Sequence, residues 1–437
     1  MKDQTKPQAG GILPDMKSVR KELFPGVYLN CIHATKFKTG LLSLQLITPL
    51  DTAQAAQGAL LPAVLHRGTA RYPDMQALSR ALDLLYGAGL SFTVRKKGEN
   101  QCLGFIASFI DDKFVPGGEK LLESIAELLG EMLLCPVTED GLFRAAYVDG
   151  EKDNLIDAIR SILDDKRDYA DQRLIEEMCR GERYGVSRLG TEAAVAALDG
   201  AALRDYYQKA LMTARLELFY CGSAGQERVE DALRRALASL PHGARIAPVA
   251  SASVAAPPEP RRLTETMDVT QGKLAMGWRA AAEDQHAMLL ANLLFGGYSN
   301  SKLFLNVREK LSLCYYASSA YHRSKGLVTV SSGVAFDDCR RAHDEILAQL
   351  ESIQRGDFEP WELEGARGVL VSAVRSREDS GARMEENTLG QAATGLWESE
   401  EELIDALNAV TAERVAAAAR SMTLDTVYFL TREEEAE

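Results

Sequence analysis

The sequence predicts an α+β protein made of two similar domains, each a mostly antiparallel sheet with helices packed on one face. Three observations lead to this prediction. The chain has 437 residues, which is long for a single hydrophobic core. Its strand-like and helix-like segments come in groups instead of alternating strictly, as is typical of antiparallel sheets. The order of these segments is the same on both sides of an Ala-, Pro- and Ser-rich stretch at residues 243–262.

The first half begins with a strand, two helices and two further strands. Apolar alternation or short apolar runs predict strands at 41–47, 90–97 and 103–110. Helical periodicity predicts helices at 54–66 and 75–85. Long helical patterns follow, and the run LELFYC at 216–221 predicts a closing strand.

The second half repeats this order with little residue identity. Strands are predicted at 273–278, 313–321, 327–334 and 426–430. Helices are predicted at 284–295, at 301–311, and from 338 to 403 and beyond. We therefore expect one duplicated unit, with domains at 1–242 and 263–437 joined by an extended linker at 243–262.

The amino-acid composition and net charge of the chain limit the kinds of partner it can bind and indicate its cellular compartment. The chain is 46% hydrophobic and 26% charged, as in soluble globular proteins. Its net charge of −13 argues against a nucleic-acid partner. The absence of a long apolar run argues against a membrane span or a signal peptide. Seven scattered cysteines without a CxxC motif are typical of reduced thiols, so we expect a cytoplasmic protein.

Motifs that would mark an active site by spacing alone are missing from the sequence. None of the six histidines has another three or four residues away, so a helical zinc site is not encoded. The sequence also contains neither GxSxG nor GxxxxGK[ST]. Residue spacing therefore assigns no reaction to this chain.

Several segments nevertheless resemble one enzyme family. They are LLPAVLHRGT at 60–69, LDLLYGA at 82–88, LFGGYSNSKLF at 294–304 and VREKLSLCYY at 307–316. Together they are similar to the insulinase/pitrilysin-type (inverzincin) metallopeptidases, and in particular to a short bacterial subgroup that lacks the zinc motif. The resemblance covers nearly the whole chain. It implies two homologous α+β domains that form half of a clamshell.

The resemblance also shows which chemistry is missing. Active members carry His-x-x-Glu-His, with two histidine ligands and a glutamate base, and a distal glutamate ligand. The corresponding positions here are Ala59, Pro62 and Ala63, with Ala158 at the distal position. We therefore expect no metal in this chain and no peptidase activity from the chain alone. Of the family's acidic pattern only Glu151 is kept.

The residues near this degenerate site carry three structural expectations. A proline inside a helix costs about 3 kcal/mol, so Pro62 is expected to shorten or break its helix. Glu151 is interpreted as a carboxylate at a helix start, where it would interact with the helix dipole. His66 has no second ligand at a suitable spacing, so we do not interpret it as a metal ligand.

The second-domain signature is intact at Arg308 and Tyr315. In the family this pair lies across the chamber from zinc and holds the substrate backbone. The resemblance therefore implies a zinc-less subunit of a heterodimeric peptidase, which supplies Arg308 and Tyr315 for peptide binding to a zinc-bearing paralogue. The isolated chain could form a homodimer. Two alternatives remain: a non-enzymatic scaffold or peptide-binding homologue, and a peptidase with a relocated metal site.

Overall fold

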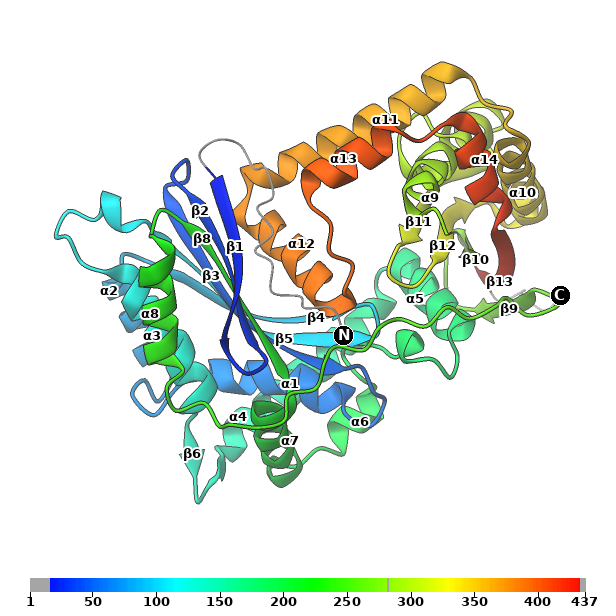
Figure 1. Cartoon of the computed structure of the whole chain (residues 1–437). Helices are drawn as coiled ribbons and strands as arrows, with labels where there is room; N and C mark the ends of the chain where they lie inside the picture. Colours follow the sequence, from blue (N-terminus) through cyan, green and yellow to red (C-terminus); the bar gives the residue numbers. More distant parts are fainter. Residues whose placement is uncertain (1–15, 281–282, 433–437) are drawn as a thin grey trace. The chain divides into compact units, whose positions relative to one another are not determined.

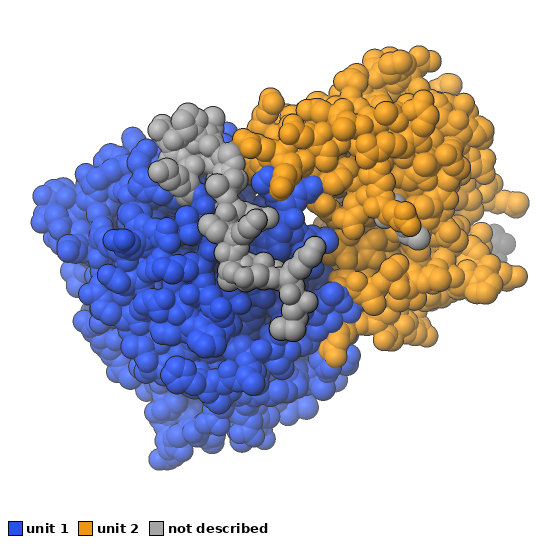
Figure 2. Space-filling model, viewed as in Figure 1, with its two compact units in different colours: residues 1–159, 186–250, 377–399 blue, residues 160–185, 251–376, 400–437 orange. Residues whose placement is uncertain are grey.

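The computed structural model describes residues 16–280 and 283–432, which form two compact units (Figure 1). The first unit contains residues up to 159, 186–250 and 377–399 (Figure 2). The second contains 160–185, 251–376 and the residues from 400 onward. The chain crosses between the units after residue 250, inside the expected linker, and each unit also includes one segment from the other half of the chain.

The first unit is built on a six-stranded sheet. Its strands lie in the order β1 (Met16–Phe24), β2 (Val27–Ala34), β8 (Arg215–Gly222), β3 (Thr39–Pro49), β5 (Asn100–Ile110) and β4 (Gly89–Lys97). Neighbouring strands are antiparallel except β2 and β8. Strands β3, β4, β5 and β8 confirm the sequence prediction, whereas β1 and β2 were not predicted. The polar sequence of β1, at the edge of the sheet, hides its strand character.

One helical layer covers one face of this sheet. Leu42, Leu44 and Leu46 of β3 point into the same core as apolar residues of α1 and α3. The α-helices that the first half of the chain gives to this unit are α1 (Ala55–His66), α2 (Met75–Leu84), α3 (Leu121–Leu134), α4 (Ala145–Arg160), α6 (Glu192–Ala196), α7 (Gly200–Thr213) and α8 (Gln226–Ala236). A small hairpin, β6 (Thr138–Glu139) and β7 (Leu142–Phe143), precedes α4.

The other face of the sheet is covered by α12 (Gly381–Thr394), which comes from the second half of the chain (Figure 1). Its apolar residues pack against Ile47 and Cys102. Glu385 of α12 is 2% exposed and accepts two hydrogen bonds from the Arg95 guanidinium of β4, at 2.6 and 2.7 Å. The Ser43 hydroxyl donates a third hydrogen bond to Glu385, at 2.7 Å. This face is therefore closed by a buried ion pair as well as by apolar contacts.

The second unit has a five-stranded sheet of similar design. Its order is β11 (Cys314–His322), β12 (Leu327–Val334), β10 (Gly272–Ala280), β13 (Met422–Thr431) and β9 (Arg261–Thr266). All pairs are antiparallel except β13 and β9. The helical layer consists of α9 (Gln285–Asn292), the π-helical segments η4 (Leu293–Gly297) and η5 (Leu303–Lys310), α10 (Cys339–Arg355), α11 (Pro360–Arg375), α13 (Glu400–Asn408) and α14 (Ala412–Arg420).

The second face of this sheet is covered by α5 (Lys166–Met178), which comes from the first half of the chain. A buried ion pair again joins the layers. Arg279 of β10 donates to Asp425 at 2.9 Å, to the Met178 carbonyl at 2.5 Å and to Glu182 at 2.6 Å. The predicted α+β class with mostly antiparallel sheets is confirmed. The prediction that helices pack on only one face of each sheet is incomplete. One helix from the other half of the chain, α12 or α5, covers the second face.

Candidate functional site

The residues at the family's metal positions lie on α1 and offer no ligand atoms. Ala59, Pro62 and Ala63 are buried, and their side chains contain only carbon. The helix runs without a break from Ala55 to His66, so the expected interruption at Pro62 is wrong. Because nearly every residue of α1 is buried, tertiary packing outweighs the cost of about 3 kcal/mol for an interior proline.

Glu151 is held by an ion pair beside this helix. It lies inside α4, which begins six residues earlier at Ala145, so its interpretation as a residue at a helix start is wrong. Its side chain is 11% exposed, and one carboxylate oxygen accepts a hydrogen bond from Arg67 Nε. The other oxygen accepts from Asn154 Nδ2 at 3.1 Å. Arg67, which directly follows α1, therefore supplies the positive charge that balances Glu151.

His66 belongs to the packing around this ion pair. Its ring lies 5.6 Å from the ring of Phe92, and its buried Nε2 atom has no hydrogen-bond partner among the described residues. Burial lowers the pKa of His66, which favours the neutral ring. A neutral imidazole can bind zinc, but a site needs several donors and the neighbouring positions supply none.

The family's zinc therefore does not fit the residues present here. No side chain at the four metal positions, Ala59, Pro62, Ala63 and Ala158, has an atom that can bind a metal. The one retained carboxylate, that of Glu151, is paired with Arg67. Within residues 16–280 and 283–432, no group of three His, Cys, Asp or Glu side chains is arranged to hold a metal ion. The described part of the chain also has no helix of the length and apolarity that a membrane crossing requires.

Arg308 and Tyr315 lie on either side of a tight connection in the second unit. Arg308 is near the end of η5, and Tyr315 is at the start of β11. The connection is fixed by hydrogen bonds from the Leu311 and Leu313 amides to carbonyls of η5, each 3.0 Å long. Ser312 within it has φ of +51°, a left-handed conformation that reverses the chain sharply. The two predicted residues are thus brought to one end of η5.

Both side chains are exposed and weakly engaged. Tyr315 is 71% exposed, occupies an irregularity in the pairing of β11 with β12, and makes no hydrogen bond to a described residue. The Arg308 side chain is 42% exposed, and its one ion pair with a described residue is a loose contact of 3.6 Å with Glu309. Its guanidinium lies 4.8 Å from the centre of the Phe304 ring. Their donors are therefore available to a ligand.

The neighbouring Tyr316, unlike Tyr315, packs against other side chains of the second unit. Its ring is partly buried, 4.4 Å from the Arg167 guanidinium of α5. Asp171, one turn further along α5, is in the same cluster, and burial raises its pKa to about 6 despite Ser331 and Arg167, which favour ionisation. The two consecutive tyrosines therefore have different surroundings, and only Tyr315 faces solvent freely.

The raised pKa of Asp171 predicts that the stability of the second unit depends on pH. Its folded-state pKa lies above the unfolded value of roughly 4, so protonated Asp171 favours the folded state. This contribution to the free energy of unfolding is complete below pH 4 and is lost as the pH rises through about 6. Asp171→Asn should raise the free energy of unfolding by about 1–3 kcal/mol at pH 7.5, and not at pH 4. Asp405→Asn, at an exposed residue of α13 in the same unit, is the control. Denaturant unfolding at the two pH values measures this, and equal stability of Asp171→Asn and wild type at pH 7.5 would contradict it.

Comparison with known proteins agrees with this picture. Residues 197–370 match the family model described as peptidase M16 inactive domain, and this range contains Arg308 and Tyr315. The chain is 32% identical over 409 residues to the probable inactive metalloprotease YmfF of Bacillus subtilis (strain 168), covering 93% of this chain and 96% of the relative. The chain belongs to the M16 peptidase family. The insulinase-type resemblance of the sequence is thereby confirmed.

Two further comparisons extend this result. The uncharacterized zinc protease YmxG of Bacillus subtilis (strain 168) is 22% identical over 80% of this chain and 86% of its own length. A crystal structure of a conserved protein from Enterococcus faecalis V583 superimposes with a TM-score of 0.88 at 27% identity, over 96% of this chain and 100% of that one. In this M16 member the family's ligand positions hold Ala59, Pro62, Ala63 and Ala158.

One residue of the site was not foreseen from the sequence. Arg67 pairs with Glu151 across 84 positions of the chain, a separation that no local pattern encodes. The only available signal was a charged residue directly after the apolar run of α1. The roles of Arg308 and Tyr315 remain predictions, although the structure places both at one exposed end of η5.

Proposed function

We propose that this chain is the zinc-less subunit of a two-chain M16 peptidase. In this pair a paralogue with an intact His-x-x-Glu-His motif carries the metal, and this chain supplies Arg308 and Tyr315 to bind the peptide. The observation that supports the proposal is a contrast between two places in the chain. The side chains at the metal positions on α1 have no metal-binding atoms, while Arg308 and Tyr315 are exposed and have no strong partner among the residues that the structure describes.

The chemistry of these two side chains suits a peptide backbone. The Arg308 guanidinium offers several N–H donors in a fixed fork, which match the carbonyl oxygens of an extended peptide. The Tyr315 hydroxyl can donate a hydrogen bond to the carbonyl oxygen on which negative charge develops. Recognition through backbone groups depends on extended conformation more than on side chains. The expected substrates are therefore short or unfolded peptides.

The setting is also part of the proposal. We expect the pair to act in the cytoplasm, because the seven cysteines include no disulfide in the structure and five of them are buried. In the absence of its paralogue, the chain can associate with a second copy of itself. No zinc is expected in this chain in either state.

The test is capture of the tagged chain from the cells that naturally produce it, followed by mass spectrometry. The expected result is stoichiometric recovery of a homologue that contains His-x-x-Glu-His. Recovery of the chain alone, or only with unrelated proteins, would contradict the heterodimer. That outcome would favour the second candidate, a non-enzymatic scaffold or peptide-binding homologue, for which the supporting observation is that the retained Glu151 is engaged in an ion pair with Arg67 at the end of α1.

A further inference from the structure

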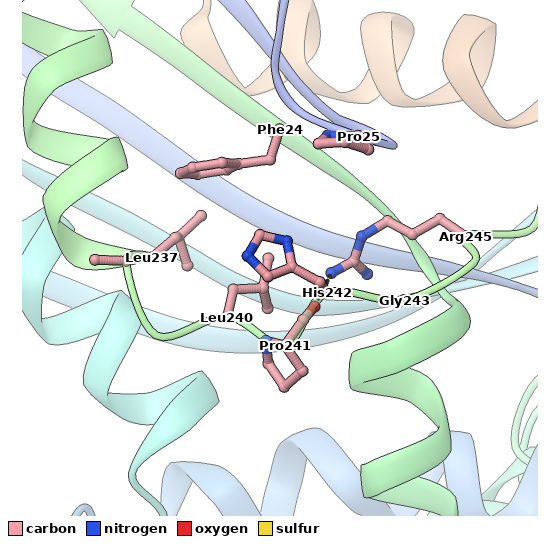
Figure 3. A pocket seen from close by; sticks show the side chains of 9 residues that line it. Phe24, Pro25, Leu237, Leu240, Pro241, His242, Gly243 and Arg245 are labelled. Atoms are coloured by element: carbon pink, nitrogen blue, oxygen red, sulfur yellow. Dashed lines mark hydrogen bonds between the residues drawn. The ribbon is translucent and has the colours of Figure 1, made fainter.

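A small pocket in the first unit lies far along the chain from Arg308 and has a different chemistry (Figure 3). Its volume is about 90 Å³, which is room for several water molecules. Three segments enclose it: the turn between β1 and β2, the chain after α8, and the start of the linker. Its walls are largely apolar, and its polar groups are the side chains of His242 and Arg245.

Arg245 is partly buried and has no acidic partner among the described residues. Its guanidinium donates to the carbonyls of Ala214 at 2.6 Å and Pro241 at 3.4 Å, and no carboxylate of a described residue pairs with it. Burial lowers its pKa, and no neighbouring charge opposes this effect. A partly buried charge without a counter-charge is unfavourable, so this arginine is suited to an anion from outside the chain.

Other partly buried arginines in the first unit show the usual arrangement. Arg20 pairs with Glu217 at 2.7 Å, Arg95 with Glu385 at 2.6 Å, and Arg228 with Glu123 at 2.6 Å. Acidic residues are abundant in a chain with 63 of them. Among the described residues Arg245 lacks such a carboxylate, as does Arg234, which donates to the Leu23 carbonyl at 2.6 Å; of the two, only Arg245 lines the pocket.

The arginine is also held in place. The Ile246 amide donates to the Thr213 carbonyl at 2.8 Å, which fixes the chain directly after Arg245. Gly26 in the β1–β2 turn has φ of +70°, and a Cβ there would lie 2.6 Å from Arg245 Cβ. The turn thus packs tightly on the arginine stem. A site that is ordered in advance binds a ligand at a lower entropic cost.

We propose that this pocket binds a carboxylate that carries a short apolar group. The carboxylate would accept hydrogen bonds from Arg245, with His242 beside it at the exposed side of the pocket (Figure 3). The apolar group would lie against Phe24, Leu237 and Leu240. The same chemistry occurs in a free short-chain acid and in the C-terminal residue of a peptide. The proposal does not depend on the peptidase role, because it involves neither Arg308 nor a partner chain.

The test compares acids with their amides on the full wild-type chain. N-acetyl-leucine should bind saturably by calorimetry or ligand-observed NMR, at least about tenfold more tightly than N-acetyl-leucinamide. Isovalerate and an acetylated tripeptide ending in leucine separate the two sources. Tighter binding of isovalerate indicates a free acid, and tighter binding of the tripeptide indicates a peptide C-terminus. Equal binding of acid and amide, or no binding, would overturn the proposal.

Two variants locate the binding. His242→Glu changes an exposed residue and places a carboxylate beside Arg245, so it should weaken acid binding at least about tenfold without affecting folding. Arg235→Gln, an exposed residue of α8 that lies outside the pocket lining, is the matched loss of one positive charge and should leave binding unchanged. Equal effects of the two variants would show that net charge, and not this pocket, determines binding.

Discussion

Arg308→Ala should lower peptide turnover by the assembled pair about 10- to 100-fold, the range expected for loss of a charge-assisted hydrogen bond. Arg308 lies at the surface, with a side chain 42% exposed, so its removal should not disturb folding. It should also leave the pair associated, because the proposed role is contact with substrate. Tyr315→Phe, which removes only a hydroxyl from a residue 71% exposed, should have an effect of similar direction.

The measurement is steady-state cleavage of an unfolded peptide by the reconstituted pair, with association checked by size-exclusion chromatography. Lys310→Ala is the matched control, since Lys310 is an exposed cation at the same end of η5. Arg308→Lys should recover only part of the activity, because an ammonium lacks the planar fork of donors. Unchanged cleavage by the Arg308→Ala pair would remove the role assigned to this residue.

Glu385→Ala should lower the free energy of unfolding of the first unit by about 3–5 kcal/mol, because it removes the buried partner of the Arg95 guanidinium and leaves only the half-exposed Glu386 to balance its charge. The Arg95 side chain is 18% exposed and that of Glu385 is 2% exposed. The substitution also removes the acceptor of the Ser43 hydroxyl. Docking of α12 on the sheet should weaken accordingly. Trp397, which follows α12 in the same unit, gives a fluorescence signal for denaturant unfolding.

Glu386→Ala is the internal control for this prediction. Glu386 also pairs with Arg95, at 2.7 Å, but its side chain is 50% exposed, so its loss should cost less than about 1 kcal/mol. A double variant, Arg95→Met with Glu385→Met, should regain much of the stability lost in Glu385→Ala, since no buried charge is left unpaired. Equal losses for Glu385→Ala and Glu386→Ala would show that burial does not determine the strength of this contact.

The sequence predicted the central strands well because each carries a dense apolar pattern. In β3, Leu42, Leu44 and Leu46 mark the strand and its core-facing side. The opposite side of β3 holds Ser43 and Gln45, which alternation alone would place in solvent, yet both are buried beneath α12. The packing of the exchanged helices on the opposite sheets was not predicted, because the strands they cover lie about a hundred or more residues away in the sequence.

The candidate site shows the same limit. Replacement of the ligand positions by Ala59, Pro62 and Ala63 is visible in the sequence once the family resemblance is recognised. The partner of Glu151 is not, because Arg67 meets it only in the folded unit. The unpaired state of Arg245 was also invisible, since it depends on the carboxylates that are absent from its surroundings. Local patterns identify residue types, whereas pairing is a property of the fold.

The most direct test of the central claim is peptide cleavage by this chain alone, by its zinc-bearing paralogue alone and by the two mixed, with zinc measured in each sample. We predict cleavage at least about tenfold faster in the mixture than in either chain alone, with no zinc in this chain and about one zinc per pair. Tightly bound zinc with cleavage by this chain alone, or full activity of the paralogue without it, would contradict the account.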